Sequence, residues 1–381
     1  MEVKQIANLL NTVNTEVLGE ENISEINEDL SNIVTIGRNV TDQLTAGGNM
    51  DNYVKKILNR IGREINWNRP YISAAPNLLK DSWEFGSILA KNKMDLPEYT
   101  NNPSWSLTDG QNYGNFTFYQ PDVNQKIFNK RSAVQTNMSF AERQFKESMT
   151  SAAGLNSFFS MIESRVEDSM TLALDDITTR AINNFIGEKI AANNCVINLL
   201  ALYNATIATP ITAANAFFNK DFQRFAAYTI ALYRNRIKSI NRQFNVTEFA
   251  AHTPENRQKL ILLDAFAKGT EVFLQSDTYH DDLVKTGNYY TVSAWQGTKD
   301  YSFANITGLN ITTDSGETVN TTGIVGVLFD DEAIALCCEN RRVTSQYVPD
   351  GEFYTNFYKM DVMAINDLSE NGIVFVVADG E

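Results

Sequence analysis

The sequence predicts a mixed α+β protein in which one long helix and one extended hairpin stand apart from more compact segments. Three observations lead to this fold class. Residues 155–190 have a continuous helical pattern, residues 70–143 contain two strand-like stretches around a turn-rich segment, and residues 337–381 alternate as strands. With 381 residues, 43% of them hydrophobic, the chain has enough apolar material for two domains or one large two-lobed unit.

Charge and composition argue against several classes of protein. Acidic residues outnumber basic ones by 46 to 32, which disfavours a protein built to grip nucleic acid, because phosphate contacts need clustered Lys and Arg. No apolar run approaches the roughly 18–20 residues of a membrane helix. The first residues lack a basic stretch followed by an apolar one, so we expect no signal peptide and a cytoplasmic site of synthesis. The three cysteines are too few for a disulfide framework.

Motifs of catalysis and cofactor binding are missing from the sequence. The two histidines, His252 and His280, have no second ligand at helical or hairpin spacing, and neither HExxH nor CxxC occurs. Gly-rich phosphate loops and GxSxG elbows do not occur either. We therefore expect no catalytic residue, no cofactor and no metal ion.

Acidic pairs are the remaining candidates for chemistry, because a glycoside hydrolase needs two carboxylates that face each other across a cleft. Such pairs occur at residues 175–176, 281–282 and 330–332. The last group follows the strand-like run 324–329 and precedes 333–336, where an acid would cap a short helix. Capping is the preferred interpretation, and a carboxylate-pair hydrolase remains an alternative.

Residues 1 to about 45 are predicted to be short, polar, weakly amphipathic helix. Its apolar stripe has three- to four-residue spacing and consists of Ile6, Leu9, Leu10, Val13 and Val17. No partner stripe lies nearby in the sequence, so we expect this segment to pack against another part of the fold or of an assembly. A second helix is predicted over residues 49–65.

The segment 70–143 is rich in prolines and aromatic residues, and it has no apolar stripe of its own. Strand-like pieces at 84–94 and 125–140 flank the turn-rich residues 97–115. This pattern is typical of an extended hairpin. Because an isolated two-stranded ribbon is marginal in water, we expect the hairpin to lie on another subunit.

The next segment, 155–190, has apolar residues at helical spacing throughout and contains no proline. At ~1.5 Å per residue the helix would be about 50 Å long. Its opposite face is acidic, with Glu163, Glu167, Asp168, Asp175 and Asp176. We interpret a single helix of this length as a strut rather than as a member of a helical bundle.

Residues 195–336 are predicted to form a second compact region. It would contain a helix at 212–244, buried strands at 259–266 and 289–295, and a loop region at 302–322. The helix would turn a large apolar face inward, with Phe218, Phe222, Phe225, Ile230, Tyr233, Ile237 and Ile240.

The last part of the chain is predicted to be a hairpin followed by one more strand. Residues 339–346 and 352–364 alternate as strands around Pro349, Asp350 and Gly351. Proline presets φ and glycine accepts a positive φ, so these three residues favour a tight turn. Residues 373–377 are expected to close the chain as a buried strand.

The order of these segments resembles the major capsid proteins of tailed double-stranded DNA bacteriophages, the HK97-like fold family. The resemblance covers nearly the whole chain, and its motifs are specific only in their joint order. The stretches concerned are VKKILNRIGR at 54–63, DSWEFGSILA at 81–90, the helix at 155–190, YYTVSAWQG at 289–297 and GIVGVLFDDEAIAL at 323–336.

The resemblance implies four parts. These are an N-terminal arm at 1–50, an extended β-hairpin loop at 70–143, an axial domain at 195–336, and a peripheral domain at 51–69, 144–194 and 337–381 with the long spine helix at about 155–190. Such proteins assemble into pentamers and hexamers that form an icosahedral shell around packaged DNA. An encapsulin-like nanocompartment with the same fold is the alternative closest to this interpretation.

Partners and location follow from the same resemblance. The chain would contact other copies of itself, a portal protein, a separate scaffolding protein and decoration proteins. It would enclose double-stranded DNA without sequence specificity and would not bind a membrane. It would be assembled in the cytoplasm of the bacterial host and end in the virion capsid.

Two sets of residues are candidate contacts between subunits. Residues 120–146 contain five basic residues against two acidic ones, so Lys126, Lys130 and Arg131 could pair with Glu163, Glu167 and Asp168 of a neighbour. The other interpretation is two unrelated solvated faces. By the resemblance, Pro349, Asp350 and Gly351 would lie at the tip of a hairpin near a local three-fold axis.

Overall fold

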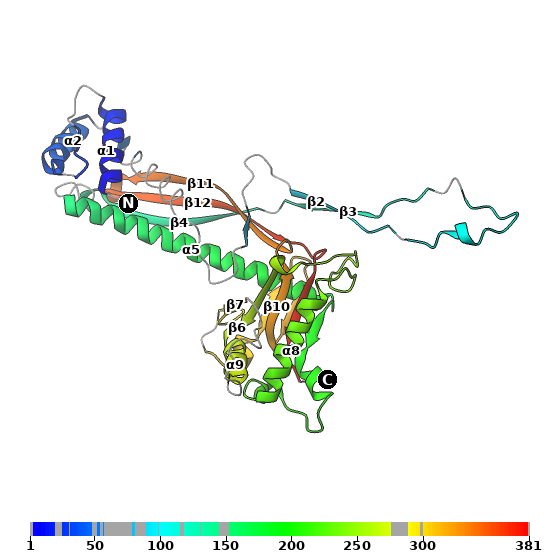
Figure 1. Ribbon diagram of the computed structural model, residues 1–381. Helices are drawn as coiled ribbons and strands as arrows, with labels where there is room; N and C mark the ends of the chain where they lie inside the picture. The colour runs from blue at the N-terminus through cyan, green and yellow to red at the C-terminus, as the bar shows by residue number, and fades with distance from the viewer. Residues whose placement is uncertain are drawn as a thin grey trace.

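The computed structural model describes residues 3–19, 25–29, 31–47, 52–53, 56, 78–80, 89–97, 99–114, 118–129, 131–144, 152–275, 289–297 and 300–379. It confirms the mixed α+β class. The long helix α5 (Ala152–Ala191) runs from one end of an elongated molecule into a compact second part, and the hairpin of β2 (Leu89–Met94) and β3 (Val123–Phe128) projects from the junction (Figure 1). Most of the predicted helix at 49–65 lies outside the described residues.

One sheet has four strands in the order β1-β11-β12-β4. Their bounds are β1 (Leu79–Lys80), β4 (Ser132–Ala141), β11 (Ile334–Val348) and β12 (Phe353–Asn366). β11 and β12 are antiparallel and are joined at the predicted residues by a short 3-10 turn, η3 (Pro349–Gly351). The positive φ expected at Gly351 lies instead at Glu352, at +46°. Every second side chain of β12 from Tyr354 to Val362 is buried, and α5 covers that face of the sheet (Figure 1).

The two N-terminal helices, α1 (Val3–Leu18) and α2 (Ile33–Gly47), pack at the far end of this sheet (Figure 1). Leu10 and Val13 of α1 are buried in a cluster with Phe140 of β4 and Tyr354 of β12. Each such side chain contributes about 1.5–3 kcal/mol when it is fully buried. The predicted stripe of the first segment therefore finds its partner within the same chain.

The second part of the molecule is built on a five-stranded sheet in the order β5-β13-β10-β6-β7. Its strands are β5 (Val196–Asn198), β6 (Gln258–Leu263), β7 (Tyr290–Val292), β10 (Ile324–Asp330) and β13 (Gly372–Val376). All seven residues of β10 are buried, as expected for a strand covered on both faces. The stretch 337–381, expected to belong to one domain, is thus divided, since β11 and β12 lie in the first sheet and β13 lies in the second.

The second part is completed by helices, one 3-10 turn and a small hairpin. A further 3-10 turn, η1 (Pro103–Trp105), lies in the projecting hairpin. The elements that complete the second part are α6 (Leu199–Asn204), α7 (Ala213–Ala216), α8 (Lys220–Arg236), η2 (Glu255–Arg257), α9 (Asp264–Gln275), α10 (Phe303–Ile306), β8 (Leu309–Thr312) and β9 (Thr318–Thr321). The helix predicted over 212–244 is thus two helices, and it ends at Arg236. Phe218 and Ile240, expected inward, are 82% and 61% exposed because they lie outside α8.

Two further predictions about local structure are wrong. The stretch 125–140 is not one strand, because β3 pairs with β2 in the hairpin whereas β4 pairs with β12 in the sheet. Asp330 does not cap a helix, because residues 334–336 begin β11 and pair with β12. Its carboxylate instead accepts a hydrogen bond from Glu332 N at 3.0 Å and pairs with Arg257. In both places cross-strand pairing prevails over a local sequence pattern.

The second half of α5 is fixed to the second part by the turn between β8 and β9. Asn184 donates to the Asp314 carboxylate at 2.8 Å and accepts from Asp314 N at 2.9 Å. One helical turn later, Glu188 accepts from Ser315 N at 2.8 Å. Phe185 lies on the buried side of α5 in the core of the second part. One continuous helix therefore contributes to the cores of both sheets.

Two glycines with nearly the same φ differ in how closely other atoms approach them. Gly323 and Gly316 have φ of +89° and +90°, but a Cβ at Gly323 would lie 2.4 Å from Val377 O, whereas nothing lies within 4 Å at Gly316. We expect Gly323→Ala to lower the free energy of unfolding by about 3 kcal/mol. Gly316→Ala should lower it by about 1 kcal/mol. Equal destabilisation of the two variants in urea unfolding would contradict this packing.

Candidate assembly interface

The β2–β3 hairpin is a two-sided ladder whose faces differ in chemistry. Its register runs from Leu89 opposite Phe128 to Met94 opposite Val123. Side chains alternate along a strand, so residues that face each other across the ladder point to the same side. One face therefore has Lys91, Lys93 and Lys126, which we call the basic face. The other face has Ala90, Asn92, Met94, Val123, Gln125 and Ile127, which we call the uncharged face.

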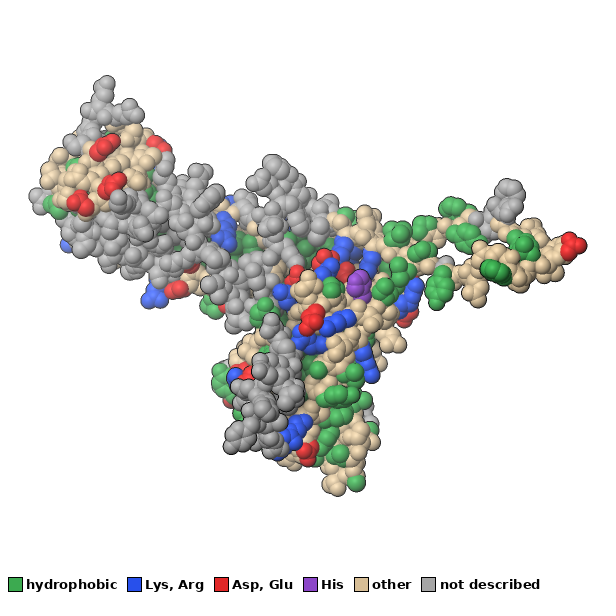
Figure 2. All heavy atoms as spheres, in the orientation of Figure 1, with side chains coloured by type: hydrophobic (Ala, Val, Ile, Leu, Met, Phe, Trp, Pro, Cys, Tyr) green, Lys and Arg blue, Asp and Glu red, His purple; other side chains and the backbone are tan. Residues whose placement is uncertain are grey.

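The uncharged face is open to solvent. Met94, Val123 and Ile127 are 62%, 56% and 55% exposed, and they form two apolar cross-strand pairs, Ala90 with Ile127 and Met94 with Val123. Beyond the ladder the hairpin continues with exposed apolar side chains: Leu96, Tyr99, Trp105, Leu107, Phe118 and Tyr119. Figure 2 shows hydrophobic side chains along the projecting part. Exposed apolar surface of this extent marks an interaction site.

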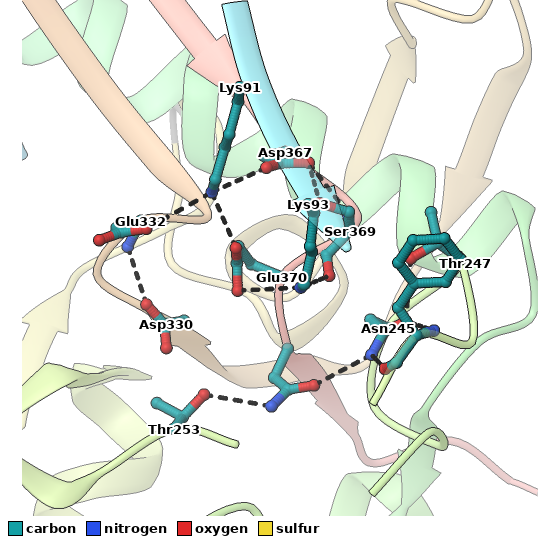
Figure 3. Close-up of polar contacts among 12 residues, drawn as sticks. Lys91, Lys93, Asn245, Thr247, Thr253, Asp330, Glu332, Asp367, Ser369 and Glu370 are labelled. Carbon is teal, nitrogen blue, oxygen red and sulfur yellow. Dashed lines mark hydrogen bonds and ion pairs between the residues drawn. The ribbon is translucent and has the colours of Figure 1, made fainter. Parts of the chain in front are cut away.

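The basic face of the ladder rests on acidic residues of the same chain (Figure 3). We call Lys91, Lys93, Lys126, Glu332, Asp367 and Glu370 the root cluster. Lys91 Nζ lies 2.9 Å from Asp367 Oδ2 and 2.8 Å from Glu370 Oε1. A third carboxylate, that of Glu332, lies 3.6 Å from the same nitrogen.

The other two lysines bind the same loop through its backbone. Lys93 Nζ donates to Ser369 O at 2.7 Å, and Lys126 Nζ donates to Asn366 O at 3.0 Å. Lys91 lies directly opposite Lys126 in the ladder, and like charges in that position repel. The Asp367 carboxylate contacts both, at 3.9 Å from Lys126 Nζ, so it compensates the repulsion.

A second anchor lies just beyond the ladder. Asp95 accepts a hydrogen bond from Ala250 N at 3.0 Å and forms an ion pair with Arg242. Both partners belong to the loop that follows α8, so the hairpin is attached to two separate segments of the body.

The loop that receives the basic face is itself held firmly. Val246 N donates to Leu368 O at 3.1 Å. The buried Asn371 donates to Thr253 Oγ1 at 3.2 Å and accepts from Asn245 Nδ2 at 3.3 Å (Figure 3). Buried polar groups that are satisfied in this way fix a loop in one conformation. The carboxylates of Asp367 and Glu370 are thus presented by a rigid segment between β12 and β13.

Electrostatics favours the charged forms at the root. Burial lowers the pKa of Lys91, but hydrogen bonds and charge from Glu370 and Asp367 outweigh it and hold the pKa above the ordinary value. Burial raises the pKa of Asp367, yet Lys91 and the donors of Ser369 keep it below the ordinary value. Asp367 has no exposed side-chain surface, so its pairing with Lys91 is essential to the site.

The candidate contacts of the basic segment lie in different places. Lys126 belongs to the root cluster of its own chain. Arg131 is exposed between β3 and β4, and Lys130 lies outside the described residues. Asp168 is exposed and Glu167 is partly exposed on α5, whereas the side chain of Glu163 is not described. Within the chain, the structure brings Lys126 to Asp367 rather than to the acidic face of α5.

The second set of candidate contacts, Pro349, Asp350 and Gly351, forms the exposed tip of the β11–β12 hairpin. Nothing in the chain covers this tip among the described residues.

Lys91, Lys93, Asp367 and Glu370 were not singled out by sequence reasoning. Alternating lysines at 91 and 93 were the available signal, but the register that puts Lys91 opposite Lys126 is not readable from the sequence.

A groove of about 710 Å³ lies beside α5, between it and the β8–β9 turn. Its lining combines amide and hydroxyl side chains with apolar ones and with the charged Asp176, Arg180 and Asp314. Among the residues that the structure describes, no cluster of His, Cys, Asp and Glu could hold a metal ion. Likewise, no helix in the described ranges is long and apolar enough to cross a membrane.

Two solved phage structures contain chains with a similar fold. A chain in the structure of head fiber and inner core protein gp22 of native bacteriophage P68 aligns with a TM-score of 0.53 at 9% identity, covering 81% of this chain and 87% of that one. The capsid structure of Staphylococcus phage Andhra aligns with a TM-score of 0.50 at 8% identity, covering 82% and 87%. At such identities the likeness concerns the fold alone.

Sequence comparison with family models goes further. The model of the Phi29-like phage major capsid protein family matches residues 10–376, and the chain belongs to this family. It is therefore a structural protein of a phage shell, in agreement with the resemblance found in the sequence. No curated protein matches the sequence. The family assignment favours the phage shell over the nanocompartment and the glycoside hydrolase.

The root cluster should respond to pH in a defined way. Because the pKa of Asp367 is lowered in the fold, its stabilising contribution is present above the ordinary aspartate value of 3.8 and is lost as the pH falls below it. Because the pKa of Lys91 is raised, its contribution is complete below the ordinary value of 10.5 and is lost at higher pH. Hydrogen exchange of β2 and β3 in the monomer should therefore be slowest between these limits. Exchange that is independent of pH after correction for intrinsic rates would contradict this assignment.

Proposed function

We propose that copies of this chain assemble into pentamers and hexamers that close an icosahedral shell around packaged double-stranded DNA. The family assignment supports self-association into a shell. The observation that carries the proposal is the β2–β3 hairpin, whose apolar side chains are exposed in the single chain. A two-stranded ribbon of this kind gains stability only when another surface covers it.

The parts of the chain have roles in this proposal. Residues 1–50 would be the N-terminal arm. Of the expected loop at 70–143, residues 81–131 would be the extended loop that lies across a neighbour, because β1 and β4 belong to the four-stranded sheet. The four-stranded sheet would form the peripheral domain, with α5 as its spine helix. Residues 195–336, together with β13, would form the axial domain near the capsomer axis. The inclusion of β13 rests on its pairing with β10 and β5.

Two contacts between subunits remain proposals. Lys126, Lys130 and Arg131 are proposed to approach Glu163, Glu167 and Asp168 of a neighbour. The position of Lys126 in the root cluster leaves it less able to do so, which shifts the proposed contact toward the other two cations. Pro349, Asp350 and Gly351, at an exposed tip, are proposed to meet another capsomer.

The proposed partners beyond the chain itself are a portal protein, a separate scaffolding protein, decoration proteins and DNA. A net charge of −14 supports a lining that repels DNA and leaves it free to move during packaging. Assembly is proposed to take place in the cytoplasm of the bacterial host. We assign the chain a structural role without catalysis, cofactor or metal.

The distal aromatic residues offer a direct test. We expect the purified chain to form shells or capsomer rings in light scattering and electron microscopy. The variant Trp105→Ser, Phe118→Ser, Tyr119→Ser should remain a folded monomer, because it lacks three of the large exposed aromatic side chains that a neighbour would cover. The matched control Asn101→Ser, Gln111→Ser, Gln120→Ser changes exposed polar residues of the same segment and should assemble normally. Equal assembly of the two variants would contradict the role given to the hairpin.

A further inference from the structure

The two faces of the β2–β3 ladder differ in what they contact within the chain. All three lysines of the basic face bind the loop between β12 and β13 or its carboxylates. On the uncharged face, by contrast, Met94, Val123 and Ile127 remain more than half exposed. The two faces lie on opposite sides of the ladder. The rotational orientation of the hairpin about its long axis therefore decides which face another molecule can contact.

Charge pairing makes the observed orientation of the hairpin lower in free energy than orientations in which it is rotated about its axis. Turning the hairpin would withdraw Lys91 from Asp367, leaving a carboxylate with no exposed surface and without its cation. An uncompensated buried charge of this kind is strongly destabilising. It would also leave Lys91 and Lys126 facing each other with no anion between them.

We propose that the root cluster fixes the rotational orientation of the hairpin about its long axis in the single chain. As a result the uncharged face, and not the basic face, docks on a second copy of this chain. The inference rests on the proposed shell function. For Lys126 it replaces the proposed contact with the acidic face of α5 of a neighbour, whereas Lys130 and Arg131 follow β3 and keep that proposed contact.

The chemistry of the exposed face favours a second copy over DNA as the occupant. The six residues of the uncharged face include no cation, so this face has nothing to bind a phosphate backbone. Its apolar pairs continue along the hairpin into exposed Leu96, Tyr99 and Phe118. At the root, Ile127 also lines a groove of about 320 Å³, whose other lining residues include the charged Lys126, Glu188 and Asp314. The family of shell proteins supplies many copies of the same chain as partners.

Lysine reactivity tests this orientation directly, without altering the protein. Acetylation with acetic anhydride, read by mass spectrometry, should be slow at Lys91 and Lys93 both in the dilute monomer and in assembled particles. The exposed Lys268, which pairs with Glu271 three residues away, serves as the reactive reference. If Lys91 is reactive in the monomer and protected only in particles, the basic face is the intersubunit contact and the proposal is overturned.

Variants separate the root from the docking face. Asp367→Asn keeps an oxygen for the Ser369 donors but removes the charge, and should make Lys91 more reactive in the monomer, although Glu370 still pairs with it. If this variant does not fold, Lys91→Gln with Lys93→Gln removes the same contacts from the hairpin side and should reduce assembly. Lys238→Gln removes an exposed pair with Glu255 away from the hairpin and is the control. Assembly of the double variant at the level of the control would overturn the proposal.

On the docking face, Val123→Ser with Ile127→Ser should leave Lys91 protected and raise the concentration needed for assembly by about tenfold or more for each apolar side chain replaced. Gln125→Ser lies on the same face and should have little effect. Unchanged assembly of the serine variant would overturn the proposal. Failure of the wild-type chain to assemble at all would count against the shell function, whereas protection of Lys91 in the monomer would still report the orientation of the hairpin.

Discussion

A two-stranded hairpin cannot bury both of its faces, and this constraint connects the fold of the chain to its role in a shell. Three lysines on one face of the ladder find carboxylates and carbonyl groups in the same chain. The hydrophobic residues on the other face find nothing comparable, and about 25 cal/mol is available for each Å² of apolar surface that a partner covers. In the single chain the basic face of the hairpin therefore has its partners, whereas the apolar side chains of the uncharged face stay exposed.

The position of the acidic loop follows from the topology of the two sheets. The loop is the short connection between β12, in the first sheet, and β13, in the second. At this junction α5 passes from one sheet to the other (Figure 1), and it is fixed to the second part through Asn184 and Glu188. The hairpin therefore starts from a region that is connected to both sheets. The direction of the hairpin is fixed because its root cannot move independently of the two hydrophobic cores.

Much of this architecture was predictable because its patterns are local. The stripe of α5, the turn at Pro349–Gly351 and the buried strand β13 follow from periodicity and turn chemistry, and the structure confirms them. The split between β3 and β4, the strand that follows Asp330 and the root cluster were not predictable, because each depends on which strands pair and in what register. A one-residue shift in that register would exchange the two faces of the hairpin.

The structure of an assembled particle, determined by electron cryomicroscopy at a resolution that shows side chains, is the most direct test of which face of the hairpin docks on a neighbour. It should show Lys91 paired with Asp367 and Glu370 of its own chain, and Val123 and Ile127 covered by a neighbouring subunit. A particle in which Lys91 pairs with a carboxylate of a neighbour, while Val123 and Ile127 stay in solvent, would contradict the proposed docking.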